Sequence, residues 1–342
     1  MIKITENADI RQMTTFGLPA ECGRLVEYDT VDDLLTLFAE GVLPQNTLPI
    51  GGGSNLLFTT GHFHGTILHC TNRTITISAP DALGNVMVDV AAGCVLDDLC
   101  FQTCQKHLWG LENLSGIPGE IGGAAVQNVG AYGVEFKDVA HKIHYFNPAD
   151  GTTGTFTADD CNYGYRDSIF KHAAKHLIIT GVQLQLTTTP TPRLGYAALA
   201  TQFEEQIHSP QLSPMQLRHA VITMRDSKLP SPTTVGSAGS FFKNPIVSAE
   251  IHAQMEQRLN RSIPGHKLAS GEVKLSAAWL IDQAGCKSLT HGAAKVWQQQ
   301  PLVIVNSDGN ATGADIVALE NAIRQKVSDI FGTDLTPEVV HI

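Results

Sequence analysis

The chain has 342 residues, 43% of them hydrophobic, which is enough to build two or three domains with buried cores. Its formal net charge of −10 argues against general binding to nucleic acids or membrane surfaces, because both of these partners are polyanions. An anionic small molecule is compatible with this charge only where arginine and lysine side chains gather locally.

Three features of the sequence favour a cytoplasmic protein. No stretch approaches the roughly 20 apolar residues needed to cross a membrane. Residues 1–6 lack the basic and apolar regions of a secretory signal. The seven cysteines are an odd number without C-x-x-C pairs, which favours reduced thiols. Cys100 and Cys104 lie one helical turn apart, and we expect both to pack in a core.

Secondary structure is predicted from hydrophobic periodicity, capping residues and breakers. In the first half we expect a helix from Thr30, strands at 67–68, 74–77 and 86–90, a helix at 95–107, and strands at 139–146 and 177–186. In the second half we expect helices at 213–227, 248–259 and 276–284, a strand at 302–306, a helix at 313–331 and an extended segment at 334–342.

Two segments stand out among these predictions. Helix 313–331 has the clearest ends, since Thr312 and Asp315 form a capping pattern and Gly332 follows its last residue. The stretch from Pro230 to Gly239 is rich in breakers, and we interpret it as a linker and domain boundary.

Two glycine-rich runs are the most informative feature of the chain. The longer run extends from Ile117 to Gly133, with five glycines and almost no charge, and the shorter run extends from Ile50 to Asn55. Glycine accepts a positive φ and lets the backbone touch a ligand, so that neighbouring N–H groups can converge on one anion. We interpret the two runs as cradles for a diphosphate-bearing cofactor.

Neither run matches the common nucleotide-binding loops. Gly119-x-x-Gly122-Gly123 lacks the spacing of the Rossmann fingerprint, and no Gly-Lys-Ser/Thr follows either run. The two runs therefore suggest a dinucleotide bound by another fold. The alternative is that both are tight turns in a β-rich domain.

Arginine and lysine side chains that could bind an anionic ligand occur in two segments. Arg166 lies between aromatic and apolar neighbours, where its guanidinium suits a carboxylate or an oxyanion, although a surface pair with Asp167 explains it equally well. Arg225 and Lys228 lie at the end of a predicted helix, where cations also complement the helix dipole.

Ser240 offers a hydroxyl group beside Lys243 and Asn244 in the segment 236–245. Its flanking residues do not form G-x-S-x-G, so a proton-donating hydroxyl is more plausible than an acylated nucleophile. The alternative is a turn at the entry to a domain, anchored by buried phenylalanines.

Glu338 places a carboxylate in an apolar extended segment. A buried carboxylate without a partner is costly, so Glu338 is either exposed or close to a cation such as Arg166. The histidine groupings His62/His64 and His141/His144 are interpreted as surface or packing residues, and we expect no metal site.

Motifs that carry a resemblance extend over nearly the whole chain. They are Thr15-Phe16-Gly17, Gly51-x-Gly53-Ser54-Asn55, Gly110-Leu111-Glu112-Asn113-Leu114, Ile117-Pro118-Gly119, Gln127-Asn128-Val129-Gly130-Ala131-Tyr132-Gly133, Gly164-Tyr165-Arg166-Asp167-Ser168, Lys228-Leu229-Pro230, Ala238-Gly239-Ser240-Phe241-Phe242-Lys243-Asn244-Pro245, Ala278-Trp279-Leu280-Ile281-Asp282 and Pro337-Glu338-Val339. In this order they resemble the UDP-N-acetylenolpyruvoylglucosamine reductases, the flavoenzymes that complete UDP-N-acetylmuramate in bacterial cell-wall synthesis. The segment near Tyr196 is similar to the longer (type I) form of that family.

The resemblance implies an α+β fold, with a two-part FAD-binding domain of the vanillyl-alcohol-oxidase (PCMH) type and a separate α+β substrate domain. We expect subdomain 1 at residues 1–70 together with 333–342, subdomain 2 at 71–229, and the substrate-binding domain at 230–332.

The resemblance also implies the reaction and its residues. Non-covalent FAD, reduced by NADPH as co-substrate, would reduce the enolpyruvyl group of UDP-N-acetylglucosamine enolpyruvate to give UDP-N-acetylmuramate. The catalytic trio falls on Arg166, Ser240 and Glu338. Substrate contacts fall on Tyr196, Lys228, Asn244 and Gln300. The expected cofactor contacts are Gly51, Gly53, Ser54, Asn55, Ile117, Pro118, Gly119, Gly122, Gly123, Gln127, Asn128, Gly130, Tyr132 and Arg225.

Two other functions compete with this one. The first is an FAD-dependent sugar or alcohol oxidase of the same fold, which would pass electrons to oxygen. The second is a non-catalytic protein that binds nucleotide sugars. Arg166, Ser240 and Glu338 suit protonation of an enolate, and that chemistry argues against both alternatives. We expect a monomer that acts on small molecules and binds neither nucleic acid nor membranes.

Overall fold

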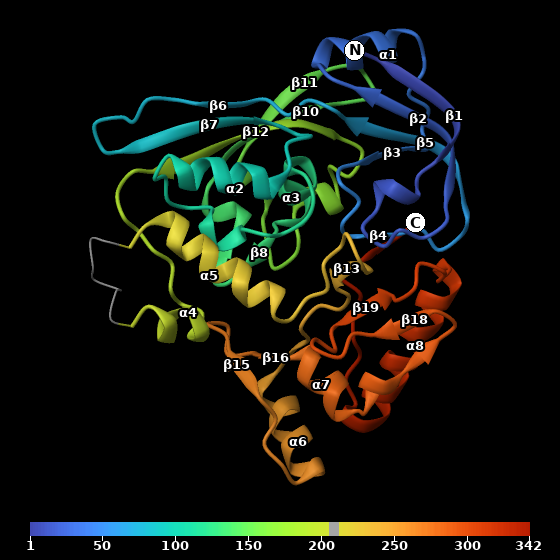
Figure 1. Ribbon diagram of the computed structural model, residues 1–342, viewed down its shortest axis with the longest axis vertical. Helices are drawn as coiled ribbons and strands as arrows, with labels where there is room; N and C mark the ends of the chain where they lie inside the picture. Colours follow the sequence, from blue (N-terminus) through green and yellow to red (C-terminus); the bar gives the residue numbers. More distant parts are fainter. Residues whose placement is uncertain (205–211) are drawn as a thin grey trace. The chain divides into compact units, whose positions relative to one another are not determined.

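The computed structural model describes residues 1–204 and 212–342 (Figure 1). Its contacts divide the chain into two compact units. Unit 1 comprises residues 1–8, 22–52 and 64–225, and unit 2 comprises residues 9–21, 53–63 and 226–342. Each unit is therefore built from segments that lie far apart in the sequence.

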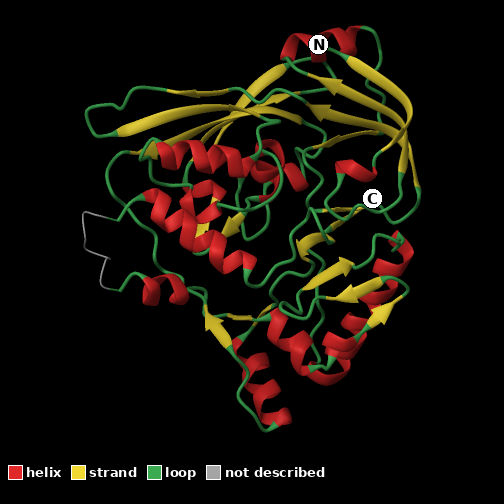
Figure 2. Cartoon of the chain, in the orientation of Figure 1, coloured by secondary structure: helices red, strands yellow, loops and turns green. Residues whose placement is uncertain are grey.

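Unit 1 contains two large sheets (Figure 2). The first has the order β1-β2-β5-β3, formed by β1 (Lys3–Asp9), β2 (Glu21–Tyr28), β5 (His62–Cys70) and β3 (Thr47–Ile50). The second has the order β11-β10-β12-β7-β6, formed by β11 (Thr153–Thr157), β10 (Ala140–Phe146), β12 (Ile178–Thr187), β7 (Asn85–Ala91) and β6 (Ile75–Ile77). The second sheet is antiparallel throughout, whereas β3 and β5 run parallel.

The helices of unit 1 are α1 (Val31–Ala39), α2 (Leu96–Gln105), α3 (Ile121–Gln127), α4 (Ala197–Gln202) and α5 (Pro214–Asp226). The start of α1 is fixed by a capping box in which Thr30 and Asp33 satisfy each other's backbone N–H groups. A short hairpin, β8 (Gly130–Ala131) and β9 (Val134–Glu135), follows α3.

One core joins both sheets of unit 1 to α1, α2 and α3. The alternation in β12 directs Val182, Leu184 and Leu186 into this core, as a period of two requires. Cys100 and Cys104 on α2 are buried in accordance with the prediction, and burial raises the pKa of the Cys104 thiol to about 12. All seven cysteines are free and buried.

Unit 2 contains smaller sheets and three helices. Its first sheet has the order β13 (Gly236–Ser240), β19 (Val303–Asn306), β18 (Ala294–Val296) and β17 (Thr290–His291). Its second sheet has the order β14 (Ile246–Val247), β16 (Val273–Leu275) and β15 (Gly265–Lys267). A third sheet is the parallel pair of β20 (Val340–His341) and β4 (Leu56–Leu57). Its helices are α6 (Ala249–Leu259), α7 (Ala277–Gln283) and α8 (Gly313–Phe331). The 3-10 helices of both units are Arg11–Met13, Glu112–Leu114, Phe136–Asp138, Asp159–Cys161, Ile169–Lys171 and Cys286–Ser288.

The core of unit 2 is organised by α8. This helix begins with the predicted capping box of Thr312 and Asp315, and it ends at Gly332, whose φ of +69° is left-handed. Its buried face, which includes Ile316, Ile323 and other apolar residues, packs against α7 and the sheet formed by β13, β19, β18 and β17.

Most of the predicted helices and strands are confirmed to within a few residues. The interpretation of 230–239 as a linker throughout is wrong, because Gly236–Ser240 forms β13 and pairs with β19. A Cβ on Gly236 would lie 2.1 Å from the carbonyl oxygen of Phe16, so glycine marks a close backbone approach there. The assignment of residues to a substrate domain and two flavin subdomains stays a prediction.

Among the described helices, none combines the length and apolar character that crossing a bilayer requires.

Replacing Thr312 with alanine should lower the free energy of unfolding by about 1 kcal/mol, because the side chain that caps α8 is lost. Urea unfolding followed by circular dichroism measures this change. The matched control is Thr223→Ala on the exposed surface of α5, which should change stability by no more than about 0.5 kcal/mol. Equal losses in the two variants would contradict a capping role.

Candidate active site

The two glycine-rich runs meet within unit 1. A Cβ on Gly52 would lie 3.2 Å from the Cα of Gly119, and a Cβ on Gly51 would lie 3.2 Å from the Cβ of Glu120. Gly119 also has a φ of +120°, which other residues rarely adopt. Glycine therefore allows the two backbones to touch, and we call these four residues the glycine junction.

Gly122 and Gly123 lie in the first turn of α3 and have different surroundings. A Cβ on Gly122 would lie 3.2 Å from the Cβ of Ala92. The N–H of Gly122 donates to the carbonyl of Ala92 at 2.9 Å. Gly122 therefore permits close packing just after the end of β7. A Cβ on Gly123 would meet no described atom within 4 Å. The space beside Gly123 is therefore open to a ligand.

The shorter glycine run continues into unit 2, where it supports the C-terminal segment. A Cβ on Gly53 would lie 2.0 Å from the carbonyl oxygen of Met13, and the φ of Gly53 is +56°. The Asn55 amide donates to the carbonyl of Glu338 at 3.1 Å, and the Asn55 carbonyl accepts from the N–H of Val340 at 2.9 Å. Asn55 therefore holds the strand that carries Glu338, and its predicted contact with the cofactor stays a prediction. Ser54 is half-buried between these residues.

A buried ionisable pair, which the sequence did not predict, lies at the glycine junction. The carboxylate of Glu120 is only 6% exposed, and both of its oxygens lie 3.2 Å from Nε2 of His69 on β5. Arg73 lies 4.0 Å from the same carboxylate but is mostly exposed. The sequence contained one signal for this pair, since Glu120 is the only charged residue within the longer glycine run.

Arg166 is held in a defined position by several contacts. Its φ of +54° is left-handed, a backbone conformation that costs about 1–3 kcal/mol in residues other than glycine. Its guanidinium donates to the carbonyl of Gly130 at 2.5 Å and lies over the ring of Tyr165. Lys171 donates to the Arg166 carbonyl at 2.9 Å and to the side chain of Gln127. The structure thus brings together three predicted site residues, Arg166, Gly130 and Gln127.

Asn128 is fully buried, and its side chain is engaged within the protein. Its amide donates to the carbonyl of Gly164 at 2.8 Å and to the carboxylate of Glu135 at 3.1 Å, while its oxygen accepts from the N–H of Lys137 at 3.0 Å. Asn128 therefore ties the segment before Arg166 to the longer glycine run. Its direct contact with the cofactor stays a prediction.

Tyr132 and Tyr196 are brought together. Their rings form an edge-to-face pair with centroids 5.0 Å apart, and Tyr196 is 40% exposed immediately before α4. Burial raises the pKa of Tyr132. A predicted cofactor contact therefore touches a predicted substrate contact.

The helix α5 contributes a network of cations. Arg225 donates from Nε to the carbonyl of Gly116 at 3.1 Å, and the N–H of Gly116 donates to Asp97 at 2.6 Å. Arg218, only 7% exposed, forms a two-pronged pair with Asp97. Burial opposes ionisation of Asp97, but hydrogen bonds from Arg218 and Gly116 outweigh it and lower the pKa. Arg218 was missed, although its spacing of seven residues from Arg225 indicated a shared helix face.

Ser240 and Glu338 lie on neighbouring segments of unit 2. The N–H of Glu338 donates to the carbonyl of Phe241 at 2.8 Å, and the N–H of Lys243 donates to the carbonyl of Thr336 at 2.9 Å. The pairing of β13 with β19 shifts register just before Ser240, where Gly239 has a φ of +69°. Such a bulge redirects the side chain that follows it. Both side chains are half-buried.

The remaining predicted substrate residues also lie in unit 2. The side-chain oxygen of Asn244 accepts from the N–H of Ala277 at 2.9 Å and so supports the start of α7. Lys228 is exposed, and its carbonyl accepts from the Trp297 indole at 3.0 Å. Gln300 is half-buried, with its carbonyl bonded to the N–H of Val303. The substrate roles of the three residues stay predictions.

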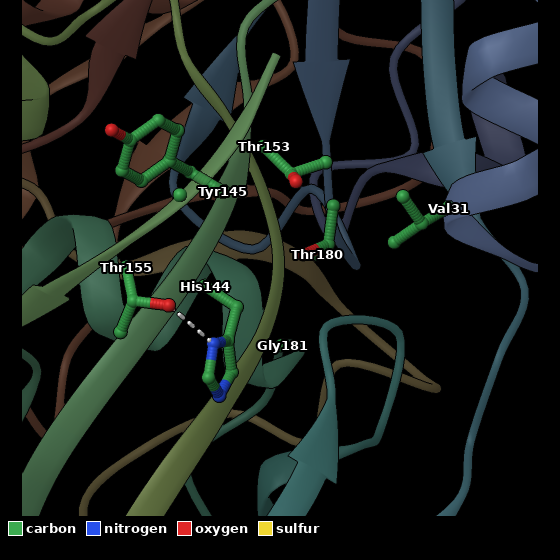
Figure 3. A pocket seen from close by; sticks show the side chains of 8 residues that line it. Val31, His144, Tyr145, Thr153, Thr155, Thr180 and Gly181 are labelled. Carbon is green, nitrogen blue, oxygen red and sulfur yellow. Dashed lines mark hydrogen bonds between the residues drawn. The ribbon is translucent and has the colours of Figure 1, made fainter.

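A cavity of about 570 Å³ lies in unit 1 away from the predicted residues (Figure 3). It is lined by Val31, His144, Tyr145, Thr153, Gly154, Thr155, Thr180 and Gly181. Nδ1 of His144 and the hydroxyl of Thr155 lie 2.9 Å apart within it. None of these eight residues was predicted to bind cofactor or substrate, so the cavity has no part in the site described above.

The described residues fit a cofactor that carries a diphosphate. Gly123 leaves open space beside the glycine junction, where Ile117 and Pro118 are half-buried. Nδ1 of His69 is buried there and has no hydrogen-bond partner among the described residues. Among the residues that the structure describes, no group of three or more histidine, cysteine or acidic side chains could hold a metal ion.

Comparisons with known proteins point to one family. A model described as an FAD binding domain matches residues 25–157, and one described as the C-terminal domain of UDP-N-acetylenolpyruvoylglucosamine reductase matches residues 231–342. A UDP-N-acetylenolpyruvoylglucosamine reductase from Bacteroides fragilis is 40% identical over 326 residues, covering 95% of this chain and 96% of the relative. The enzyme of that name from Photorhabdus laumondii is 40% identical over 333 residues, covering 96% and 94%.

A solved structure supports the fold. The structure of UDP-N-acetylenolpyruvylglucosamine reductase from Thermus caldophilus matches 100% of this chain and 98% of its own, with a TM-score of 0.69 and 23% identity. The predicted α+β class and the FAD-binding domain are confirmed.

Replacing Gly123 with alanine should separate stability from cofactor binding. The flavin-free chain should gain up to about 1 kcal/mol, because alanine favours helix over glycine and the added methyl group meets nothing. The affinity for FAD should fall roughly tenfold, because the same methyl group crowds the ligand space. Urea unfolding and fluorescence titration with FAD measure the two effects.

The matched control for this variant is Gly122→Ala, whose methyl group would crowd Ala92 and should lower stability instead. If Gly123→Ala binds FAD as tightly as the wild-type chain, the cofactor does not lie against this part of α3.

Proposed function

Because this chain belongs to the UDP-N-acetylenolpyruvoylglucosamine reductase family, we propose that it reduces the enolpyruvyl group of UDP-N-acetylglucosamine enolpyruvate to give UDP-N-acetylmuramate. The chain is an FAD-dependent oxidoreductase of peptidoglycan precursor synthesis, and NADPH is its electron source. The observation that carries the proposal is that the FAD-binding match over 25–157 contains both glycine-rich runs.

The cofactor would be held by the glycine junction, Gly123 and the neighbouring residues of the longer glycine run. When bound, FAD would supply the hydride that adds to the terminal vinyl carbon of the substrate. The protein must then stabilise negative charge on the adjoining carbon, which is delocalised into the substrate carboxylate as an enolate.

Arg166 is proposed to stabilise this developing charge. Its guanidinium is held by the Gly130 carbonyl and its backbone by Lys171, so the cation does not have to reorganise during the reaction. Removing one such group typically costs about 2.7–4 kcal/mol of transition-state stabilisation. Glu338 is proposed to polarise the substrate carboxylate through a shared proton or to position the cation.

Ser240 is proposed to donate the proton that completes the reduction. A serine hydroxyl is a weak acid, so its conjugate base must be stabilised by nearby cations, and Lys243 follows three residues later. Substrate contacts are proposed for Tyr196, Lys228, Asn244 and Gln300. Arg225, also a proposed cofactor contact, and Lys228 would offset the negative field of the protein around the UDP diphosphate.

The finer assignments are proposals of the same kind. We propose a flavin subdomain 1 at 1–70 with 333–342, a flavin subdomain 2 at 71–229 and a substrate domain at 230–332. The enzyme is proposed to act as a cytoplasmic monomer.

An oxidase of the same fold is the competing enzyme, and a non-catalytic nucleotide-sugar binder is the competing binding protein. An oxidase would return electrons to oxygen and needs no proton donor for an enolate. A binding protein needs none of the three groups on Arg166, Ser240 and Glu338. Their joint presence supports the reductase.

Replacing Ser240 with alanine should leave reduction of the flavin by NADPH unchanged and slow its reoxidation by the enolpyruvyl substrate roughly 10²–10⁴-fold, because proton donation is lost. Anaerobic stopped-flow absorbance of the flavin measures the two half-reactions separately.

Ser270→Ala, on an exposed turn of the same unit, is the matched control and should behave as wild type in both half-reactions. An equal fall in both half-reactions of the Ser240 variant would rule out its role as a proton donor. Flavin that is reoxidised only by oxygen in the wild-type protein would favour the oxidase.

A further inference from the structure

The segment 116–119 leads into α3 and contains three of the predicted contacts to FAD. All four of its residues are half-buried, whereas the residues on either side of it, Ser115 and Glu120, are buried. The segment is therefore accessible to a ligand, and its shape depends on how its two ends are held.

The first turn of α2 holds both ends of this segment. At one end, the N–H of Gly116 donates to the carboxylate of Asp97 at 2.6 Å. At the other end, the carbonyl of Gly119 accepts from the N–H of Leu96 at 3.0 Å. The second contact uses backbone atoms alone, whereas the first needs a side chain. The position of Gly116 therefore depends on where the Asp97 carboxylate lies.

An arginine from α5 fixes that carboxylate. The two terminal nitrogens of Arg218 donate to the two oxygens of Asp97, one of them at 2.8 Å. Such a fork sets both the position and the orientation of a carboxylate. Acidic residues in a first turn also complement the helix dipole, and the exposed Asp98 beside it suits that purpose without any such partner.

Arg218 is itself held in place, because it is buried and its guanidinium carbon lies 5.5 Å from the centre of the Phe101 ring on α2. Two turns further along α5, Arg225 donates from Nε to the carbonyl of Gly116 at 3.1 Å. The two arginines of α5 thus act on the two backbone groups of Gly116, Arg218 through Asp97 and Arg225 directly.

The backbone of Gly116 needs such contacts. Its φ is +72°, and a Cβ there would lie 3.2 Å from Nε of Arg225, so glycine suits the position. Glycine also has access to more backbone conformations than any other residue, which makes its geometry costly to fix. The hydrogen bonds from Asp97 and Arg225 select one conformation among these.

We propose that Asp97 and Arg218 are positioning residues of the cofactor site, which fix the backbone of Gly116 so that residues 117–119 have the shape that receives FAD before it binds. The inference rests on the proposed function, because it requires FAD to contact this segment. A site ordered in advance binds more tightly, since less conformational freedom is lost on binding.

The test compares two double variants that both lack the ion pair. Asp97→Asn/Arg218→Met keeps a side-chain oxygen that can accept from the N–H of Gly116, whereas Asp97→Ala/Arg218→Met does not. The fluorescence of FAD released on serial dilution gives its dissociation constant from the full-length holoenzyme, at a temperature where circular dichroism shows every variant to be folded. The alanine double variant should bind FAD roughly three- to tenfold more weakly than the asparagine double variant, the factor that one hydrogen bond supplies.

Arg218→Met alone should weaken FAD binding roughly threefold, because Asp97 keeps its bond to Gly116 but is no longer aligned. The visible circular dichroism of the bound flavin should differ from that of the wild-type protein most in the alanine double variant. A pair that only joined α2 to α5 would lower the melting temperature of both double variants and leave their dissociation constants equal. Equal dissociation constants in the two double variants, or wild-type affinity in Arg218→Met, would overturn the inference.

If the alanine double variant fails to fold, Arg218→Lys decides, because lysine keeps the charge and cannot form the two-pronged pair. It should weaken FAD binding roughly threefold, and wild-type affinity would refute the inference. The matched control is Arg324→Met, which breaks another two-pronged pair, with Asp334 in unit 2. Its FAD affinity should be that of the wild-type protein, and a loss as large as in Arg218→Met would contradict a specific role.

Turnover separates this inference from the proposed function. A wild-type protein that binds FAD and reduces the enolpyruvyl substrate, with variants that keep wild-type affinity for FAD, refutes only the inference. A wild-type protein without bound FAD refutes the proposed function.

Discussion

The contact between two backbones at Gly52 and Gly119 is the constraint on which the flavin half of the molecule depends. A single methyl group at Gly52 would lie 3.2 Å from the Cα of Gly119, so glycine lets the two runs meet here without moving either backbone. Because β3 leads into the shorter run and α3 lies within the longer one, this contact also helps to set how a strand of the first sheet meets the helix that packs against the second sheet. The cofactor site and the packing of unit 1 thus share one steric requirement.

The helices and most central strands could be predicted because their signals are local. In α8, the capping pair Thr312 and Asp315, the apolar period and Gly332 all lie within one short segment. The strands β1 and β2 were not predicted, since many of their residues are polar or half-exposed and their pairing partners are distant in sequence. The residues of β13 have the composition of a linker, because they are small and a propensity scale scores glycine as a breaker, whereas Gly236 serves a close approach to Phe16.

The candidate site was predictable as a set of motifs, but the sequence could not divide those motifs into binding and supporting residues. Asn55, Asn128 and Asn244 each use side-chain groups to hold the backbone of another segment. Their motifs therefore also contain residues that support the structure around the chemical groups. Arg218, His69 and Glu120 escaped prediction for the opposite reason, because each acquires its importance only from a partner brought close by folding.

Asn55 holds the strand that carries Glu338, and this contact limits when the chain can fold during its synthesis. The two residues are separated by 283 positions, and β4 pairs in parallel with β20 across the same interval. At 5–20 residues per second, β4 therefore waits on the ribosome for roughly 15–60 s before its partner has been made. The buried carboxylate of Glu320 waits only about 1–4 s at the same rate for His341, which lies 3.0 Å away in the folded protein. Unit 2 can close only after translation has passed these last strands, whereas most of unit 1 can already have folded.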